Sequence, residues 1–148
     1  MHDNAPALSI RPFVESDEGA VIALWQLCEL TRPWNDPRRD VARKLGVQRE
    51  WFLVGHVGDE LVASVMAGYD GHRGSLNYLA VAPAMRGRGY GTALIRRIEA
   101  LLTEAGCPKI NLLVRRGNAG VVAFYQRIGY GLDDTVQLGR RLIPDTPT

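Results

Sequence analysis

The chain of 148 residues is poor in cysteine, in lysine and in long apolar runs. Its two cysteines, Cys28 and Cys107, indicate neither a disulfide framework nor a cysteine-based metal cluster. No stretch approaches the ~20 apolar residues of a membrane-spanning helix. The polar N-terminus, MHDNAPA, has no apolar run of the signal-peptide kind. We therefore expect a cytoplasmic protein that binds no metal and does not associate with a membrane.

Lysine contributes little to the positive charge. Lys44 and Lys109 are the only lysines, and arginine supplies the other cationic side chains of a chain whose net charge is +2. This balance does not favour a nucleic-acid binder, although a local basic patch can still serve a polyanionic ligand. With 46% hydrophobic and 23% charged residues, the composition is ordinary for a globular protein. We expect residues 1–148 to form a single domain.

The most informative stretch is Leu76–Glu104. Its first part, Leu76–Ala82, is apolar and ends at Pro83, which predicts a strand. Its last part has the apolar periodicity of an amphipathic helix. Between them lies Arg86-Gly87-Arg88-Gly89-Tyr90-Gly91. Glycines let a backbone approach a ligand closely, and the first N–H groups of a helix have no partners within it, so this turn is typical of a phosphate site.

Three phosphate-binding motifs compete for this turn. A P-loop needs a Gly-Lys-Ser/Thr ending, which is missing, and a dinucleotide fingerprint needs a glycine where Thr92 or Leu94 stands. The third motif, Arg/Gln-x-x-Gly-x-Gly/Ala, is met by Arg86, Gly89 and Gly91. It resembles the pyrophosphate loop of the GCN5-related N-acetyltransferases, which bind acetyl-coenzyme A. The competing interpretation is a glycine-rich turn that carries surface arginines.

The resemblance implies two sets of coenzyme contacts. In this family the two central strands splay apart and the pantetheine arm lies between them like an added strand. The backbone of Leu79, Ala80 and Val81 would then pair with it, and a backbone N–H would polarise the thioester carbonyl. The turn would hold the pyrophosphate through Arg86, Gly87, Arg88, Gly89, Tyr90, Gly91 and Thr92.

A second signature runs from Asn118 through Tyr125 to Gly129-Tyr130. It resembles the Asn…Tyr…Gly-aromatic element near the end of these enzymes. The resemblance implies that Asn118 contacts the pantetheine arm and that Tyr125 is the general acid for the departing thiolate. The structural alternatives are a core aromatic for Tyr125 and a helix N-cap for Asn118.

The general base is not evident. Family members that acetylate ribosomal-protein N-termini carry a glutamate where this chain has Leu113. The substrate amine would lose its proton through water, or to one of four side chains: Glu29, Asp36, Asp70 or His72. Asp70 and His72 also fit as ordinary turn residues.

The acceptor pocket of this fold lies between the connection of the first two helices and the final strands. That implies substrate contacts from Arg32, Trp34 and Asp36. Together with the turn over Tyr69–Gly74, the segment resembles the bacterial YpeA-type branch, which names no substrate. The alternative for Trp34 is a loop aromatic that covers the core.

The order of elements predicts an α/β (α+β) fold with a mixed central sheet, helices on both faces and splayed central strands. Helices are expected to end near residues 30, 48, 104 and 128. Strands are expected over residues 8–13, 51–57, 61–69, 76–82 and 109–115, with a closing pair over 130–132 and 136–142. The same order is that of the GCN5-related fold, so the resemblance covers almost the whole chain.

These observations predict an acetyl-coenzyme A-dependent N-acetyltransferase in which a primary amine, of a small molecule or a protein, attacks the thioester directly. Cys28 and Cys107 fall at structural positions, so no covalent intermediate is expected. The alternative is a non-catalytic acyl-coenzyme A-binding sensor or partner-binding module, which the missing base favours; nucleic-acid binding ranks below both. Dimers are common among such small enzymes, so a homodimer is compatible with this prediction.

Overall fold

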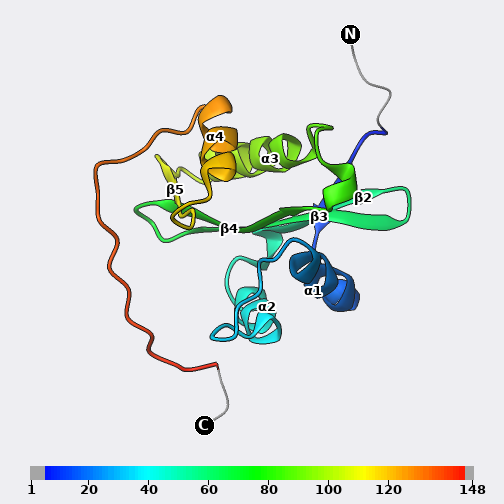
Figure 1. Ribbon diagram of the computed structural model, residues 1–148, viewed down its shortest axis with the longest axis horizontal. Coiled ribbons are helices and arrows are strands. Elements are labelled where there is room, and N and C mark those ends of the chain that lie inside the picture. The colour runs from blue at the N-terminus through cyan, green and yellow to red at the C-terminus, as the bar shows by residue number, and fades with distance from the viewer. Residues whose placement is uncertain (1–5, 146–148) are drawn as a thin grey trace.

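A computed structural model of the chain describes residues 6–145 and contains one five-stranded sheet in the order β1-β2-β3-β4-β5 (Figure 1). The first four strands are antiparallel, and β5 is parallel to β4. The mixed sheet confirms the predicted fold class. The strands are β1 (Ser9–Pro12), β2 (Phe52–Val57), β3 (Glu60–Tyr69), β4 (Gly74–Val81) and β5 (Ile110–Leu112).

Helices cover both faces of this sheet. Helices α1 (Glu18–Leu27) and α2 (Pro37–Leu45) lie on one face, and α3 (Tyr90–Glu104) and α4 (Ala119–Arg127) lie on the other (Figure 1). Each face has its own apolar core. Trp25 of α1 is central to one core, and the buried residues Leu94, Ile98 and Leu102 of α3 belong to the other. Short 3-10 turns occupy Glu15–Asp17, Arg49–Trp51 and Pro83–Met85.

The first two helices are shorter than the sequence pattern predicts. Helix α1 ends at Leu27 because Glu29 has a left-handed backbone, with φ +59°, which a right-handed helix cannot contain. Helix α2 ends at Leu45, and Gln48 takes a similar conformation. The start of α2 is as its sequence indicates: the Asp36 carboxylate accepts the N–H of Arg38 at 2.9 Å, and proline follows at the first helical position.

Strand β5 is also shorter than predicted, and this shapes the site. It pairs with β4 over three residues only, from Gly74–Ile110 to Leu76–Leu112. Beyond Leu112 the chain leaves the sheet, whereas β4 continues to Val81. The two strands therefore part, as the family resemblance implies, and leave one edge of β4 without a strand partner over residues 77–81.

The predicted closing strands over residues 130–132 and 136–142 are wrong for this single chain. Residues 131–144, here called the strap, are exposed and contain neither helix nor strand. They leave α4 and arc outside β5 toward α2 (Figure 1). The apolar alternation is present, but a strand needs a partner backbone, and among residues 6–145 the strap makes no backbone–backbone hydrogen bond.

Asp145 holds the end of the strap. Its buried carboxylate accepts the backbone N–H of Asp36 at 2.8 Å and is bound by Arg43 at 2.5 Å. The hydrogen bond from Arg43 lowers the pKa of Asp145 to about 2. The strap thereby ends at the first turn of α2, beside the connection between the first two helices.

No helix within the described residues 6–145 is long and apolar enough to span a membrane. The same residues contain no group of three His, Cys, Asp or Glu side chains that could hold a metal ion. Both cysteines are free thiols.

We expect Asp145→Asn to lower the melting temperature at neutral pH. The native pKa of about 2 lies below the ordinary value of about 3.9, so this carboxylate stabilises the fold above about pH 4, and that contribution is lost as the pH falls through 2. The variant should therefore lose stability at pH 7 and show a weaker decline between about pH 4 and pH 2. Thermal melts across pH test this, with Asp59→Asn in an exposed turn as the matched control. Identical melts for Asp145→Asn and wild type at pH 7 would contradict it.

Candidate functional site

The glycine-rich turn lies where its sequence predicts, between the end of β4 and the start of α3. Gly87 and Gly89 have φ of +80° and +82°, which L side chains rarely adopt, and α3 begins at Tyr90. The turn is exposed, and Arg86 and Arg88 are its charged residues. A helix N-terminus offers unpaired N–H groups and a positive dipole end, so this turn fits a polyanion such as a pyrophosphate.

Two residues of the turn, Tyr90 and Gly91, pack against other parts of the protein. The Tyr90 side chain is buried and donates its hydroxyl to the carbonyl of Pro6 at 2.6 Å, so only its backbone faces a ligand. A Cβ at Gly91 would lie 3.5 Å from Phe124 and 3.6 Å from Val81. These are ordinary contact distances, so Gly91 lies where α3, α4 and the end of β4 meet, at a place that would still accept a Cβ.

The unpaired edge of β4 contains Leu79, Ala80 and Val81, the three residues that the resemblance implies as pantetheine contacts. Leu79 lines a cavity of about 690 Å³ in which β4 and the chain after β5 face each other. The Val81 carbonyl already accepts from Arg86 Nε at 3.1 Å and from the Cys28 thiol at 3.4 Å. The carbonyl of Val81 is therefore engaged.

A bulge interrupts β4 beside this edge. The pairing with β3 shifts between Ser64–Ala80 and Met66–Asn77, which leaves Tyr78 and Leu79 opposite a single residue of β3. Tyr78 has φ +53°, a left-handed conformation that is strained for an aromatic residue.

Buried polar contacts fix the orientation of this bulge. The Ser64 hydroxyl donates to the Tyr78 carbonyl at 3.0 Å and accepts from Trp25 Nε1 at 2.9 Å. The C=O and N–H of a trans peptide point in opposite directions. Since the Tyr78 carbonyl points at Ser64, the Leu79 N–H points away from it, and Leu79 lines the cavity.

The Tyr78 side chain is held as firmly as its backbone. Its ring stacks on Trp25 with 3.8 Å between centroids, and its hydroxyl donates to the Asp40 carboxylate at 2.6 Å. Burial, with the Asp40 carboxylate, raises the pKa of Tyr78. The phenol therefore stays neutral and keeps Asp40 on the cavity wall.

Tyr125 and Asn118 come from α4 and its start, and both line the same cavity. Tyr125 is 8% exposed, packs edge-on against Phe124 and Tyr130, and its hydroxyl has no hydrogen-bond partner among residues 6–145. Burial raises its pKa to about 12. Asn118 occupies the N-cap position of α4, but its side chain makes no capping hydrogen bond. Both polar groups are thus available to a ligand in the cavity.

The residues predicted for the acceptor separate into two groups. Arg32 lines the cavity, together with Asn35. Trp34 and Asp36 are not among the described residues that line it. The Arg115 guanidinium, whose residue lines the cavity, lies 5.6 Å from the Trp34 ring centroid, and Asp36 caps α2.

The structure also shows which candidates for a general base line the cavity and which do not. Glu29 lines the cavity, whereas Asp36 is engaged as the cap of α2. The Asp70 carboxylate accepts the N–H groups of His72 and Arg73, both at 2.7 Å, which is the geometry of a turn. Asp40 also lines the cavity, and sequence reasoning missed it because its position follows from how α2 packs against Tyr78.

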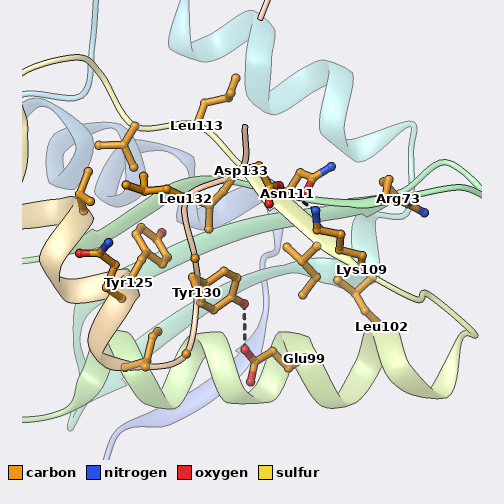
Figure 2. A pocket seen from close by; sticks show the side chains of 18 of the residues that line it. Arg73, Glu99, Leu102, Lys109, Asn111, Leu113, Tyr125, Tyr130, Leu132 and Asp133 are labelled. Carbon is orange, nitrogen blue, oxygen red and sulfur yellow. Dashed lines mark hydrogen bonds and ion pairs between the residues drawn. The ribbon is translucent and has the colours of Figure 1, made fainter. Parts of the chain in front are cut away.

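A larger cavity of about 1370 Å³ lies on the other side of Tyr125, between β5, α3, α4 and the strap. Figure 2 shows Tyr125, Tyr130, Leu113 and Leu132 around it. The Tyr130 hydroxyl donates to Glu99 of α3 at 2.8 Å, which ties the end of α4 to α3. Sequence reasoning did not anticipate this cavity, because it assigned the strap to closing strands.

The sequence profile of the Acetyltransferase (GNAT) family matches residues 20–130. An acetyltransferase of Yersinia enterocolitica is 51% identical over 138 residues, which cover 93% of this chain and 98% of that protein. An acetyltransferase of Pectobacterium atrosepticum has the same identity and coverage. Among solved structures, the ribosomal-protein-S18-alanine N-acetyltransferase of Escherichia coli superposes with a TM-score of 0.70 at 20% identity, over 83% of this chain and 77% of that one. AAC(6')-Iy, solved with the bisubstrate analog CoA-S-monomethyl-acetylneamine, superposes with a TM-score of 0.73 at 17% identity. The superposition covers 93% of this chain and 99% of that one.

We expect Ser64→Ala to destabilise the fold, because it leaves the Trp25 N–H and the Tyr78 carbonyl buried without their partner. Each unpaired group costs about 1–3 kcal/mol of the free energy of unfolding. Chemical denaturation measures this, with Ser75→Ala on the exposed part of β4 as the control. A loss no larger than that of the control would show that the Ser64 hydroxyl does not hold the bulge.

Proposed function

Since the chain belongs to the GNAT acetyltransferase family, we propose that it transfers the acetyl group of acetyl-coenzyme A to a primary amine, which attacks the thioester directly. The observation that carries this proposal is the parting of β4 and β5 beside Tyr125. Leu79 on the free edge of β4 and the buried phenol of Tyr125 line one cavity, and the glycine-rich turn follows at the end of β4.

The coenzyme would be held at two places. Its pyrophosphate would contact the backbone N–H groups at the start of α3 and the side chains of Arg86 and Arg88. Its pantetheine arm would lie along the free edge of β4, with Asn118 beside it. The absence of side chains at Gly87, Gly89 and Gly91 supports this assignment, because a ligand phosphate needs close approach to the backbone.

The thioester carbonyl would accept a hydrogen bond from the Leu79 N–H. A donor is effective in catalysis when it is already oriented toward the developing negative charge. Ser64 would act as a positioning residue, since its hydroxyl donates to the Tyr78 carbonyl and so orients the peptide that carries this N–H, and Trp25 Nε1 donates to the Ser64 hydroxyl in turn.

Tyr125 would donate its proton to the coenzyme A thiolate as the C–S bond breaks. The pKa of about 12 keeps the phenol protonated at neutral pH, and its hydroxyl has no competing partner among the described residues. No acyl-enzyme is needed, and the Cys28 thiol, which lines the cavity, already donates to the Val81 carbonyl at 3.4 Å.

The amine would enter from the side of the connection between α1 and α2. Glu29 and Asp40 place two carboxylates on this wall, beside the cationic side chains of Arg32 and Arg115, and a carboxylate suits a substrate ammonium group. Asp40 already accepts from Tyr78 and from Arg43, so Glu29 or water is the better acceptor for the amine proton. Arg32 would contact other polar groups of the acceptor, and the chemistry of the wall does not distinguish a small molecule from a protein amine.

The proposal is tested by incubating the enzyme with acetyl-coenzyme A and a panel of primary amines, with detection of free thiol and of the acetylated product by mass spectrometry. We expect thiol release that depends on the amine and matches the acetylated product one to one. Coenzyme binding without turnover on any amine would instead support a non-catalytic acyl-coenzyme A-binding module.

We expect acetyl-coenzyme A to raise the melting temperature, since a ligand that binds only the folded state stabilises it. Gly89→Val should abolish that rise, because a side chain at φ +82° strains the turn and blocks close approach of a phosphate. Gly58→Val, at φ +59° in the β2–β3 hairpin turn and outside the glycine-rich turn, is the control for strain alone and should keep the rise. Equal rises from coenzyme A and from a pantetheine fragment without phosphates would rule out the turn as the pyrophosphate site.

We expect Tyr125→Phe to lower kcat while the affinity for acetyl-coenzyme A stays nearly unchanged, because the proton is donated only in the transition state. General acid catalysis contributes roughly 10²–10⁴-fold, and a thiolate is a good leaving group, so the low end applies. Tyr69→Phe, whose hydroxyl contacts the carbonyls of Gly71 and Gly106, is the matched control. A kcat within about twofold of wild type, with chemistry rate-limiting, would exclude Tyr125 as the general acid.

A further inference from the structure

The charges on the wall of the 690 Å³ cavity do not balance. Its four charged side chains are Glu29, Arg32, Asp40 and Arg115. Asp40 already has a cation, because its carboxylate accepts from Arg43 at 3.2 Å. Within residues 6–145 none of the other three takes part in an ion pair. One carboxylate and two guanidinium groups are therefore left for a ligand.

Arg32 is held with one edge of its guanidinium free. Its Nη1 donates to the carbonyls of Glu29 and Thr31, both at 2.8 Å, and the Asn35 N–H donates to the Arg32 carbonyl at 3.0 Å, which closes a tight turn. Among residues 6–145 the Nε and Nη2 groups of Arg32 make no hydrogen bond. These two groups form the edge through which a guanidinium binds a carboxylate with two parallel hydrogen bonds.

Arg115 joins the same part of the wall from the chain after β5. Its guanidinium lies 5.6 Å from the ring centroid of Trp34, which belongs to the turn that Arg32 and Asn35 close. Contact with an aromatic face orients a guanidinium and leaves its N–H edge free. The Asn35 oxygen accepts from Arg141, so its NH₂ group remains as a further donor in the cavity. The turn thus gathers donors that suit an anion.

Resting on the acetyl transfer proposed above, we propose that the acceptor amine also carries a carboxylate, as amino acids do, and that Arg32 and Arg115 bind this carboxylate. Such an acceptor supplies both missing partners, with its amine toward Glu29 and its carboxylate at the two arginines. A polyamine supplies only cations and leaves both arginines without an anion. A site discriminates against a ligand that leaves its charged groups unpaired.

The wild-type protein tests this with a ladder of acids and their amides: glycine, β-alanine, 4-aminobutyrate and 6-aminohexanoate, each against the same compound with a carboxamide. The amide keeps the amine and the length but loses the negative charge. Hydrogen bonds to charged groups are the stronger ones, so we expect kcat/KM for the best acid to exceed that for its amide by roughly tenfold or more. The difference should lie in KM, because the carboxylate takes no part in the chemistry.

The source of the carboxylate is read from a second pair, a peptide amide that begins with aspartate and its asparagine counterpart. A preference within the ladder assigns the carboxylate to a small amino acid, and a preference confined to the peptide pair assigns it to a protein side chain. Equal kcat/KM for acid and amide in every pair would overturn the proposal and leave the proposed acetyl transfer intact.

Arg32→Ala should lower kcat/KM for the acid far more than for the amide, so that the ratio between them approaches one. Arg115→Ala should act in the same direction. Arg38→Ala, which removes an exposed arginine outside the cavity, should keep the wild-type ratio. An unchanged ratio in both cavity variants, or an equal loss of affinity for acetyl-coenzyme A, would overturn the assignment of these arginines to the acceptor.

Thermal melts of coenzyme A-saturated protein give a readout that needs no turnover. We expect the best acid to raise the melting temperature and its amide to raise it less, since a ligand that binds only the folded state stabilises it. This difference should disappear in Arg32→Ala. If no amine is acetylated and the acid still stabilises the protein, the carboxylate site stands and the proposed function fails. Equal melts with acid and amide would overturn the proposal.

Discussion

The left-handed backbone of Tyr78 is the constraint on which the site depends. A non-glycine residue in this conformation costs about 1–3 kcal/mol. Three contacts offset that cost: the ring stacks on Trp25, the hydroxyl binds Asp40 and the carbonyl binds Ser64. The conformation adds an extra residue to β4, and it turns the next peptide so that its N–H points away from Ser64. Strained residues that surrounding contacts hold in place, like β-bulges, occur most often at functional sites, and Tyr78 fits that pattern.

The two faces of the sheet contribute different parts of the site. Helices α1 and α2 hold the bulge from one face, and the cavity wall on that face contains Asp40 of α2 with Glu29 and Arg32 of the connection between the two helices. Helices α3 and α4 supply the glycine-rich turn and Tyr125 from the other face. Because β4 and β5 part after three residue pairs, Tyr125 from one face and Glu29, Arg32 and Asp40 from the other line one cavity.

Sequence predicts the parts of this site that are local in the chain. The strand-turn-helix unit around Gly89 and the helix that carries Tyr125 are each formed by residues close together in the chain. The spacing of those residues is therefore enough to predict both elements. The bulge is different, because Trp25, Ser64 and Tyr78 meet only when α1, β3 and β4 have packed together. The position of Asp40 likewise depends on the packing of α2. No single-sequence pattern encodes such contacts.

The strap shows a second limit of structure prediction from sequence. Its apolar alternation predicts a strand, yet a strand forms only where another backbone can pair with it. Within one chain the Asp145 anchor keeps the strap from β5, so the prediction of closing strands fails for the single chain. The predicted ends of α1 and α2 are wrong for a local reason. Both ends are set by residues with a left-handed backbone, Glu29 and Gln48, and residue type does not reveal that conformation.

The central claim is that the acetyl group lies at the free edge of β4, against the Leu79 N–H. The most direct measurement is the change in the backbone amide resonances of isotope-labelled protein when a non-transferable acetyl-coenzyme A analogue is added. The account predicts that Leu79 shifts more with the acyl analogue than with coenzyme A, while the amides at the start of α3 shift equally with both. A Leu79 resonance that does not distinguish the two ligands would contradict it.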